Sequence, residues 1–299
     1  MEAQKPDILF IVNPNAGKRN IRKLLRKLKK WQSKIDVQIS RSPGHCTKII
    51  HSELNNYTTF VAAGGDGTVN EVASALYGSN KKMAVYPVGS GNGFAREFGF
   101  NKNIDSLIKH IEQGKSLPTD VLFLNGHLSI HLSGVGYDSA VAHYFDQRKG
   151  RGFWNYVVST ICVILNYKPI EVTIQYDNKT ITGSFFMINI ANNRQFGFNA
   201  CIAPNANPTD GSFELVLVSP LSFWSFPLFS FKLFMGNLKP SKKMKIISCK
   251  KEVMLTSSET KFHIDGEPAT FNSPVIIKIE PAKLLVVDTG KTKFKQPYE

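Results

Sequence analysis

A glycine-rich turn that contains one acidic residue is the strongest sign of chemistry in this 299-residue sequence. A strand-type run ending at Ala63 leads into Gly64, Gly65, Asp66, Gly67 and Thr68, and helix-type spacing follows from Val69. Glycines lack a Cβ, so backbone N–H groups can approach phosphate oxygens, and the N-terminus of the following helix adds positive potential. Asp66 would repel a phosphate, which indicates a divalent cation such as Mg²⁺ between them. A plain strand-to-helix turn would explain one or two glycines but not three around an acid.

Two further glycine turns follow predicted strands. Asn13, Pro14, Asn15, Ala16 and Gly17 come after residues 8–12, and Gly89 to Gly93, including Ser90, come after residues 84–88. The carboxyl ends of successive parallel strands form one crevice, where open α/β sheets bind ligands. The sequence has no GxxxxGK[ST] motif, the third turn misses the last position of GxGxxG, and Val88 occupies the first glycine of GxSxG. A P-loop, a dinucleotide fingerprint and a nucleophilic Ser90 are therefore excluded.

Two carboxylates flank Gly266 close to the end of the chain, at Asp265 and Glu267. Phosphoryl transfer to an alcohol needs a base for the hydroxyl proton, a metal on the phosphates, and positioning. In an extended segment both carboxylates would project from one face. A hairpin turn explains the same residues and is locally the simpler interpretation, just as a plain turn explains Asp210 and Gly211.

The elements around these turns change character along the chain. Strand-type runs at 8–12, 37–40, 59–63 and 84–88 alternate with helical stretches, which predicts a parallel sheet with helices on its faces. The runs 171–176, 182–190, 213–218, 261–264 and 275–279 are separated by Gly, Pro and Asn, which predicts an antiparallel sandwich or open barrel. We expect a nucleotide-binding α/β domain at 1–125, to which the last ~15 residues are candidates to return, and a β-sandwich domain at 126–299.

Together these motifs resemble the diacylglycerol kinase catalytic domain, which soluble bacterial lipid kinases and sphingosine kinases share. The resemblance covers nearly the whole chain. Beyond the three turns, it includes Asn70-Glu71, Phe94-Ala95-Arg96, Gly134-Val135-Gly136-Tyr137-Asp138, Ala191-Asn192, Ala203-Pro204-Asn205-Ala206, Asp210-Gly211 and Asp265-Gly266-Glu267. The GGDGT segment alone also occurs in NAD kinases and phosphofructokinases, so it is the later motifs that favour lipid kinases.

The resemblance implies an ATP site between the α/β domain and the β-sandwich, with a lipid hydroxyl as phosphoryl acceptor in the second domain. It implies a structural Mg²⁺ held by Asp210 with the backbone carbonyls of Asn207 and Ser212, Glu267 as proton acceptor with Asp265 beside it, and Asp66 organising Mg²⁺ on the phosphates. The residues implied to contact nucleotide are Asn13, Pro14, Asn15, Ala16, Gly17, Ser40, Gly64, Gly65, Asp66, Gly67, Thr68, Val69, Asn70 and Ser90.

The acceptor lipid depends on the third turn. Bacterial diacylglycerol kinases usually place Asp after the Asn of this turn, and here the residue is Gly93; the sphingosine kinases also lack that Asp. We expect diacylglycerol, giving phosphatidic acid, as the leading acceptor, with a sphingoid-base or ceramide-type kinase as the alternative. A nucleotide-binding regulator without transfer activity is a third interpretation, against which the intact Asp66 and Glu267 argue.

The charge balance favours an anionic partner. Thirty-seven Lys and Arg against 23 Asp and Glu give a formal net charge of +14. Residues 18–34 hold nine Lys and Arg with no acid, and apolar residues at helical spacing predict a helix packed on the sheet with a basic outer face. The aromatic run 221–235 precedes six lysines in 239–251; a membrane interface or a buried core element explains it equally well. No RRM or OB pattern supports nucleic-acid binding.

The remaining features concern location. The N-terminus lacks a basic region, a long apolar region and a cleavage site, and no stretch approaches the roughly 20 apolar residues of a spanning helix. Four widely separated cysteines favour a reducing compartment. We expect a cytoplasmic protein, peripheral to the membrane, that uses ATP and Mg²⁺; its sequence leaves a homodimer open.

Overall fold

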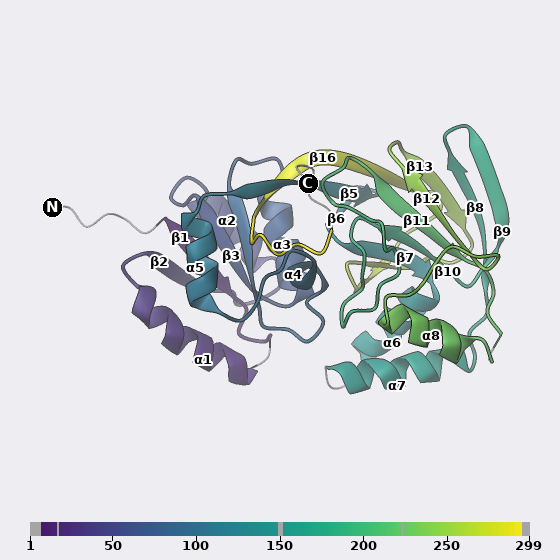
Figure 1. The fold of residues 1–299 in the computed structure, drawn as a ribbon, viewed down its shortest axis with the longest axis horizontal. Helices are drawn as coiled ribbons and strands as arrows, with labels where there is room; N and C mark the ends of the chain where they lie inside the picture. Colours follow the sequence, from purple (N-terminus) through teal and green to yellow (C-terminus); the bar gives the residue numbers. More distant parts are fainter. Residues whose placement is uncertain (1–6, 17, 149–151, 223, 295–299) are drawn as a thin grey trace. The chain divides into compact units, whose positions relative to one another are not determined.

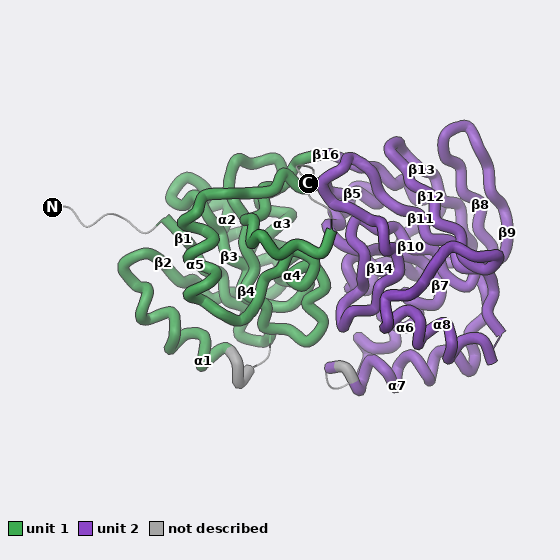
Figure 2. Tube along the Cα trace, in the orientation of Figure 1, with its two compact units in different colours: residues 1–119, 282–296 green, residues 120–281, 297–299 purple. Residues whose placement is uncertain are grey.

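The computed structural model describes residues 7–16, 18–148, 152–222 and 224–294 (Figure 1). The chain forms two compact units, residues 1–119 with 282–296 and residues 120–281 with 297–299 (Figure 2). This division falls ahead of the predicted boundary at 125/126, which lies in the two-residue turn between β5 (Ser116–Leu124) and β6 (His127–Ser129). Asn125 and Gly126 of that turn both have positive φ, the geometry typical of a tight hairpin.

The first unit is built on a parallel sheet. Its strand order is β2 (Ile35–Ile39), β1 (Ile8–Val12), β3 (Thr59–Gly64), β4 (Lys82–Pro87) and the last part of β16 (Val275–Val287). Its helices are α1 (Lys18–Leu28), α2 (His45–Glu53), α3 (Asp66–Leu76), α4 (Gly93–Glu97) and α5 (Ile104–Glu112), with the 3₁₀ turn η1 (Lys29–Trp31). Every residue of β1 and β3 is buried, as expected for parallel strands covered on both faces. The predicted α/β architecture is confirmed.

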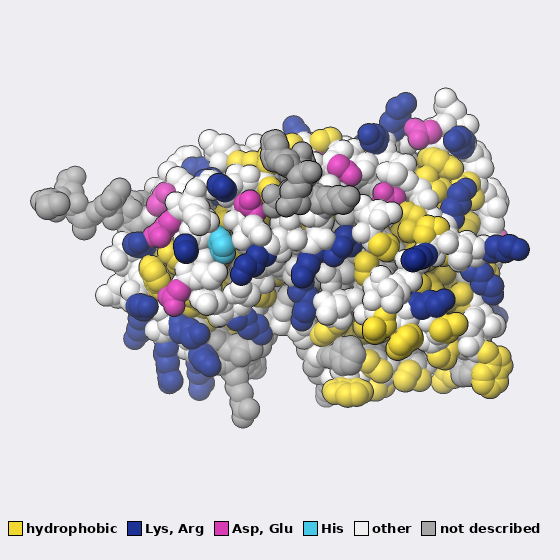
Figure 3. Space-filling view, viewed as in Figure 1, with side chains coloured by type: hydrophobic (Ala, Val, Ile, Leu, Met, Phe, Trp, Pro, Cys, Tyr) yellow, Lys and Arg dark blue, Asp and Glu magenta, His cyan; other side chains and the backbone are white. Residues whose placement is uncertain are grey.

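Helix α1 has the predicted two-sided character. Ile21, Leu24 and Leu28 are buried, whereas the basic residues around them are exposed. Figure 3 shows Lys and Arg side chains gathered over this helix. The apolar spacing therefore packs the helix, and the charge stays in solvent.

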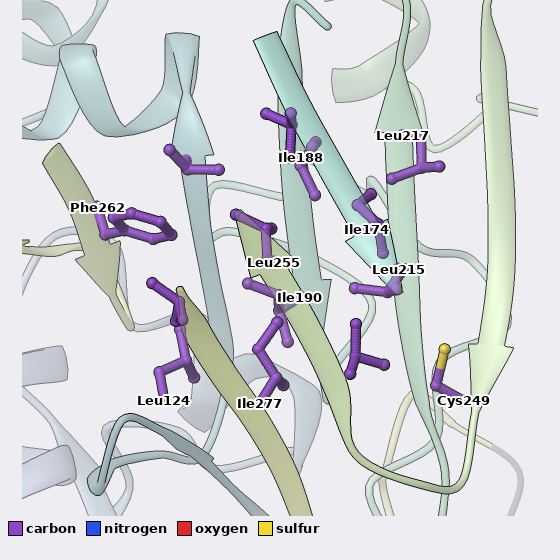
Figure 4. Packing of buried hydrophobic residues seen from close by; sticks show 14 of the residues in the cluster. Leu124, Ile174, Ile188, Ile190, Leu215, Leu217, Cys249, Leu255, Phe262 and Ile277 are labelled. Carbon is purple, nitrogen blue, oxygen red and sulfur yellow. The ribbon is translucent and has the colours of Figure 1, made fainter. Parts of the chain in front are cut away.

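The second unit is a sandwich of two antiparallel layers. One layer has the order β12 (Met244–Cys249), β11 (Phe213–Val218), β10 (Met187–Ala191), β7 (Leu132–Gly136), β14 (Lys261–Ile264) and β15 (Glu267–Thr270). The other includes β16, β13 (Val253–Ser257), β8 (Ile170–Tyr176) and β9 (Lys179–Phe185). Ile188 and Ile190 of β10 meet Leu255 and Ile277 in the core between the layers (Figure 4). The predicted β-sandwich is confirmed.

Three helices in the second unit are absent from the prediction, which contains strands alone in this part of the chain. They are α6 (Tyr137–Gln147), α7 (Phe153–Ile164) and α8 (Phe226–Phe234). Helix α7 is rich in β-branched residues, whose weak strand preference is overridden here by packing. The predicted strand 182–190 is in fact the end of β9 and most of β10, separated at Phe186. No helix in the described ranges is long and apolar enough to span a membrane.

Candidate active site

Hydrogen bonds tie the three glycine turns of the first unit together. The Nδ2 of Asn13, after β1, donates to Thr68 Oγ1 at 2.9 Å. The backbone N–H of Asn92, after β4, donates to Asp66 Oδ2 at 2.9 Å. The turns after β1, β3 and β4 therefore lie side by side at the carboxyl edge of the sheet, as the alternation of strands and helices predicts.

Two of the glycines are required by close packing. A Cβ on Gly64 would lie 2.4 Å from Thr68 side-chain atoms, and a Cβ on Gly89 would lie 2.9 Å from the Cα of Gly65. Gly89 N–H and Val88 N–H also both donate to the carbonyl of Gly64. A larger residue at Gly89 would separate the second turn from the third, and one at Gly64 would displace the Thr68 side chain within its own turn.

The predicted phosphate loop is in large part the first turns of helix α3. Gly65 is the N-cap, and the next five predicted residues, Asp66, Gly67, Thr68, Val69 and Asn70, are helical. The first N–H groups of a helix have no intrahelical acceptor, so they are available to an anion. Val69 is buried and its N–H already donates to the Gly65 carbonyl at 3.0 Å, so it has no free N–H for a ligand. The Thr68 hydroxyl accepts from Asn13 and still has its own proton to donate.

The turn after β1 is closed on itself. Asn13 Oδ1 accepts the Asn15 N–H at 2.9 Å, and the Asn13 carbonyl accepts the Ala16 N–H at 3.2 Å. Pro14 lies between them, and Gly17 is outside the described residues. The Asn13 side chain thus stabilises its own turn through Oδ1 and connects this turn to the next one through the Nδ2 bond to Thr68.

Ser40 and Ser90 occupy different surroundings. Ser90 is exposed after β4. Ser40 is buried at the end of β2, where its N–H donates to the Val12 carbonyl. Beside it is a shallow, open recess lined by Gln38, Ile39, Arg41 and His45.

Cys46 next to Ser40 is not set up as a nucleophile. Burial raises the pKa of its thiol to about 11, and the negative charge of Glu71 adds to the rise, whereas hydrogen bonding to Ser40 opposes it. The thiol is therefore protonated at neutral pH.

Glu71 has a positioning role that the sequence did not reveal. Its Oε1 accepts the backbone N–H groups of Cys46 at 2.8 Å and Thr47 at 3.3 Å. These belong to the first turn of α2, whose N-cap Gly44 has no side chain to offer. Glu71 thus caps α2 from the neighbouring helix α3, a contact between residues too far apart in sequence to show as a local capping motif.

Asp265 in the second unit is buried in a hairpin turn. Ile264 pairs with Glu267, so Asp265 and Gly266 form the two-residue turn between β14 and β15 with φ of 51° and 89°. Its Oδ1 accepts from the Ser129 hydroxyl at 2.7 Å and the His131 N–H at 2.9 Å, and its Oδ2 from the Ile130 N–H at 3.0 Å. The hairpin turn, the simpler of the two interpretations, is confirmed, and the extended segment is wrong, because the pairing of Ile264 with Glu267 leaves Asp265 and Gly266 to close the turn.

Glu267 differs from Asp265 in accessibility. It is the first residue of β15 and is exposed, whereas Asp265 is 6% exposed. The two carboxylates therefore do not form a matched pair on one face. Asp265 holds the 129–131 segment, and Glu267 can meet a substrate.

The turn around Asp210 is closed by side-chain oxygens. Asp210 Oδ1 accepts from the Ser212 N–H at 2.9 Å and hydroxyl at 2.7 Å, and Asn207 Oδ1 accepts from the Thr209 N–H at 3.1 Å. A second carboxylate, which the sequence did not single out, joins it: Asp120 Oδ2 accepts the Gly211 N–H at 2.7 Å. Asp120 is buried in β5 with no local sequence signal.

The donors of this turn suit a hard cation. Carboxylates, carbonyls and water are the ligands that suit Mg²⁺, which keeps several waters when it binds a protein. Burial raises the pKa of nearby Glu214, the negative charge of Asp210 raises it further, and hydrogen bonding to Ser248 opposes this. The described residues contain no group of three or more His, Cys, Asp or Glu placed to hold a metal, so carbonyls of the 207–212 turn and water would have to complete the coordination. On these donors the turn fits Mg²⁺.

A buried polar network lies near the sandwich layer that carries Asp265. His263 Nε2 is 2.7 Å from Asp138 Oδ2, and Asn189 Nδ2 donates to the same oxygen. A Cβ on Gly134 would lie 2.5 Å from that oxygen, which explains the glycine. Only the GxGYD spacing pointed to Asp138, and nothing local linked it to His263.

Solved structures share this two-unit fold. A crystal structure of a diacylglycerol kinase from Bacillus anthracis str. Sterne superposes with a TM-score of 0.73 at 20% identity, covering 94% of this chain and 96% of that chain. At this identity the likeness establishes the architecture.

The sequence comparisons establish the family. Residues 7–124 match the diacylglycerol kinase catalytic domain, and residues 132–288 match the YegS C-terminal NAD kinase beta sandwich-like domain. A relative from Staphylococcus carnosus (strain TM300) is 26% identical over 292 residues, 92% of this chain and 95% of that protein. The diacylglycerol kinase of Bacillus subtilis (strain 168) is 25% identical over 227 residues, 73% and 75% of the two chains. The chain belongs to the lipid kinase family defined by these two domains, and membership implies ATP as phosphoryl donor.

Proposed function

We propose that this protein transfers the γ-phosphoryl group of ATP to the hydroxyl of a membrane lipid in a Mg²⁺-dependent reaction, with diacylglycerol as acceptor and phosphatidic acid as product. The observation that supports it best is the pair of hydrogen bonds, Asn13 to Thr68 and Asn92 to Asp66, that assembles three phosphate-type turns at one sheet edge. The name of the Bacillus subtilis relative supports diacylglycerol as the acceptor.

Each unit has a distinct part in the proposed reaction. The N–H groups of α3 and the turns after β1 and β4 bind the phosphates, and Asp66 orients the cation that accompanies them. Bound Mg²⁺ supplies neutralisation of phosphate charge. Glu267 accepts the proton of the lipid hydroxyl as the phosphoryl group arrives, and Asp265 fixes the turn that carries Glu267.

A sphingoid base or ceramide is the second candidate acceptor. Gly93 stands where the bacterial diacylglycerol kinase pattern usually has Asp; it is buried at the start of α4, so this edge lacks one carboxylate of that pattern. Loss of transfer activity is the less supported alternative, because Asp66 and Glu267 are both present.

The test is transfer of radiolabel from γ-labelled ATP to diacylglycerol, ceramide, sphingosine and NAD, the lipids being presented in mixed micelles. We expect label in diacylglycerol, its loss on chelation of Mg²⁺, and its near absence in Asp66→Asn. This variant keeps an oxygen that can accept the Asn92 N–H but removes the charge that orients the cation. Label in NAD alone, or in no lipid, would overturn the proposal, and label in sphingosine or ceramide alone would move it to the second acceptor.

We also propose that Asp210 holds a structural Mg²⁺, and we expect Asp210→Ala to abolish the rise in melting temperature that Mg²⁺ gives the wild-type protein. A ligand that binds only the folded state stabilises it by mass action. Ser212→Ala is the matched control, because it removes the hydroxyl bonded to Asp210 but keeps both the carboxylate and the Ser212 carbonyl. Equal Mg²⁺-dependent rises in Asp210→Ala and the wild type, measured by calorimetry without nucleotide, would rule the site out.

A further inference from the structure

Helices α7 and α8 carry apolar stripes on their outer faces. The exposed large apolar side chains recur every three or four residues, so each set lies along one side of its helix. In and just after α7 they are Trp154, Val158, Ile161 and Leu165, and around α8 they are Trp224, Leu228, Phe231 and Met235. Trp154 is 77% exposed and Trp224 is 87% exposed.

The opposite sides of the same helices are fastened to the protein. Tyr156 and Val163 of α7 and Phe226 and Leu233 of α8 pack against one apolar cluster on the β10–β11 sheet. Tyr137 of α6 connects the two, because its hydroxyl donates to the Thr160 carbonyl at 2.7 Å and its ring lies 5.3 Å from that of Phe226. The outer apolar side chains therefore stay exposed, because the opposite sides of both helices already pack against the protein.

These stripes form one surface, which we call the α7–α8 face and define by the eight residues above. Figure 3 shows apolar side chains gathered over α7 and α8. Scattered exposed apolar residues are ordinary, but a contiguous patch of this kind on a soluble protein marks an interaction surface. No residue of α8 is fully buried, although the helix is apolar except for Ser230 and Lys232.

The composition around the face identifies an anionic lipid surface as its partner. Neither helix contains Asp or Glu. Exposed lysines border the face, with Lys168 after α7, Lys232 on α8 and Lys239, Lys242 and Lys243 after α8. Trp at the end of an apolar stripe with Lys beside it is the arrangement that suits the headgroup boundary of a bilayer. A packed protein interface would be depleted in lysine, whereas an anionic bilayer attracts it.

We propose that the α7–α8 face inserts shallowly into an anionic bilayer and holds the second unit on the membrane. This deepens the proposed function by naming the surface that meets the acceptor lipid's membrane. Vesicle binding is measured without nucleotide, so it succeeds or fails independently of phosphoryl transfer.

Tryptophan fluorescence tests insertion directly. In Trp31→Phe the remaining tryptophans are the two of the face. Vesicles of phosphatidylcholine with phosphatidylglycerol should shift their emission to the blue, and binding should be tighter than to pure phosphatidylcholine and should weaken as salt screens the charges. An unshifted emission in the presence of bound vesicles would overturn the proposal.

Paired substitutions test the face itself. Ile161→Ser/Leu165→Ser and Leu228→Ser/Phe231→Ser should each lower the vesicle partition coefficient tenfold or more in sedimentation assays. Val37→Ser makes the same kind of change at an exposed position on β2 of the first unit and should leave partitioning unchanged. Retained transfer to a monomerically dispersed short-chain diacylglycerol would show that the variants fold.

The contrary outcomes are distinct. Wild-type partitioning in both paired variants overturns the proposal. So does a dimer that dissociates in these variants while vesicle binding persists, because the face would then join two copies of the chain. Loss of vesicle binding in a protein that phosphorylates no lipid would keep the docking face and reject the kinase function.

Discussion

Asp265→Ala is expected to destabilise the protein by about 4 kcal/mol, because the Asp265 carboxylate is the acceptor for three donors of the 129–131 segment. Deleting a buried acceptor leaves these donors without a partner, which costs about 1–3 kcal/mol for each buried group left unsatisfied. Asp265 also has φ of 51°, a conformation that Asp and Asn adopt more readily than Ala does. Urea unfolding followed by circular dichroism measures the change.

Asp265→Asn is the matched control for that experiment. It keeps the turn preference and one acceptor oxygen but removes the charge, so its stability should lie between those of the wild type and Asp265→Ala. If Asp265→Ala instead keeps wild-type stability and loses turnover, Asp265 acts on the substrate and its hydrogen bonds are incidental.

The fold of the first unit was predictable because its signals are local. Buried parallel strands appear as short continuous apolar runs, and three of them, β1, β3 and β4, lead into glycine-bearing turns. The strand Ile8–Val12 has the same bounds as the apolar run that predicts it. The convergence of the turns then follows from the rule that parallel strands end at one edge, and the contacts from Asn13 to Thr68 and Asn92 to Asp66 agree with it.

The second unit was harder because its helices are decided by packing. Residues 153–164 are uncharged and include many β-branched side chains, a pattern compatible with a strand or a helix. What selects the helix is that Tyr156, Val163 and their neighbours fit the same cluster as α8. The apolar spacing in residues 224–235 is also visible in the sequence. Which of these side chains face the core depends on which side of the helix packs against the apolar cluster, and the sequence does not show that.

Within the candidate site, the residues missed are those that act across long sequence separations. Glu71 caps a helix that begins more than twenty residues earlier. Asp120, at the start of the second unit, accepts the N–H of Gly211, which is 91 residues later in the chain. Neither leaves a local pattern, because both contacts exist only after the sheets form. Asp265 was noticed for its chemistry, but its place in a turn was set by the pairing of Ile264 with Glu267.

A large loss of activity is expected for Glu267→Gln, which should lower the single-turnover rate of phosphoryl transfer by roughly 10² or more, the usual contribution of a general base. Glutamine keeps the size and hydrogen-bonding capacity of the side chain but cannot accept the hydroxyl proton. Glu267 is exposed at the start of β15, so the change should leave stability nearly unaltered, in contrast to substitutions at Asp265. ATP affinity should also be nearly unchanged, because the phosphate-type turns belong to the first unit.

Glu252→Gln is the matched control, since it makes the same chemical change in the second unit at an exposed ion pair with Lys278, and such pairs contribute little. ATP affinity by calorimetry and single-turnover transfer by quench flow separate the possible roles of Glu267. A turnover rate within a few-fold of the wild type would show that Glu267 is not the base and that the Asp265 to Glu267 segment is purely structural. A collapse of ATP binding would instead make Glu267 a ligand-positioning residue. Proton acceptance requires a different pattern: Glu267→Gln loses most of its transfer rate but binds ATP normally, and Glu252→Gln keeps both.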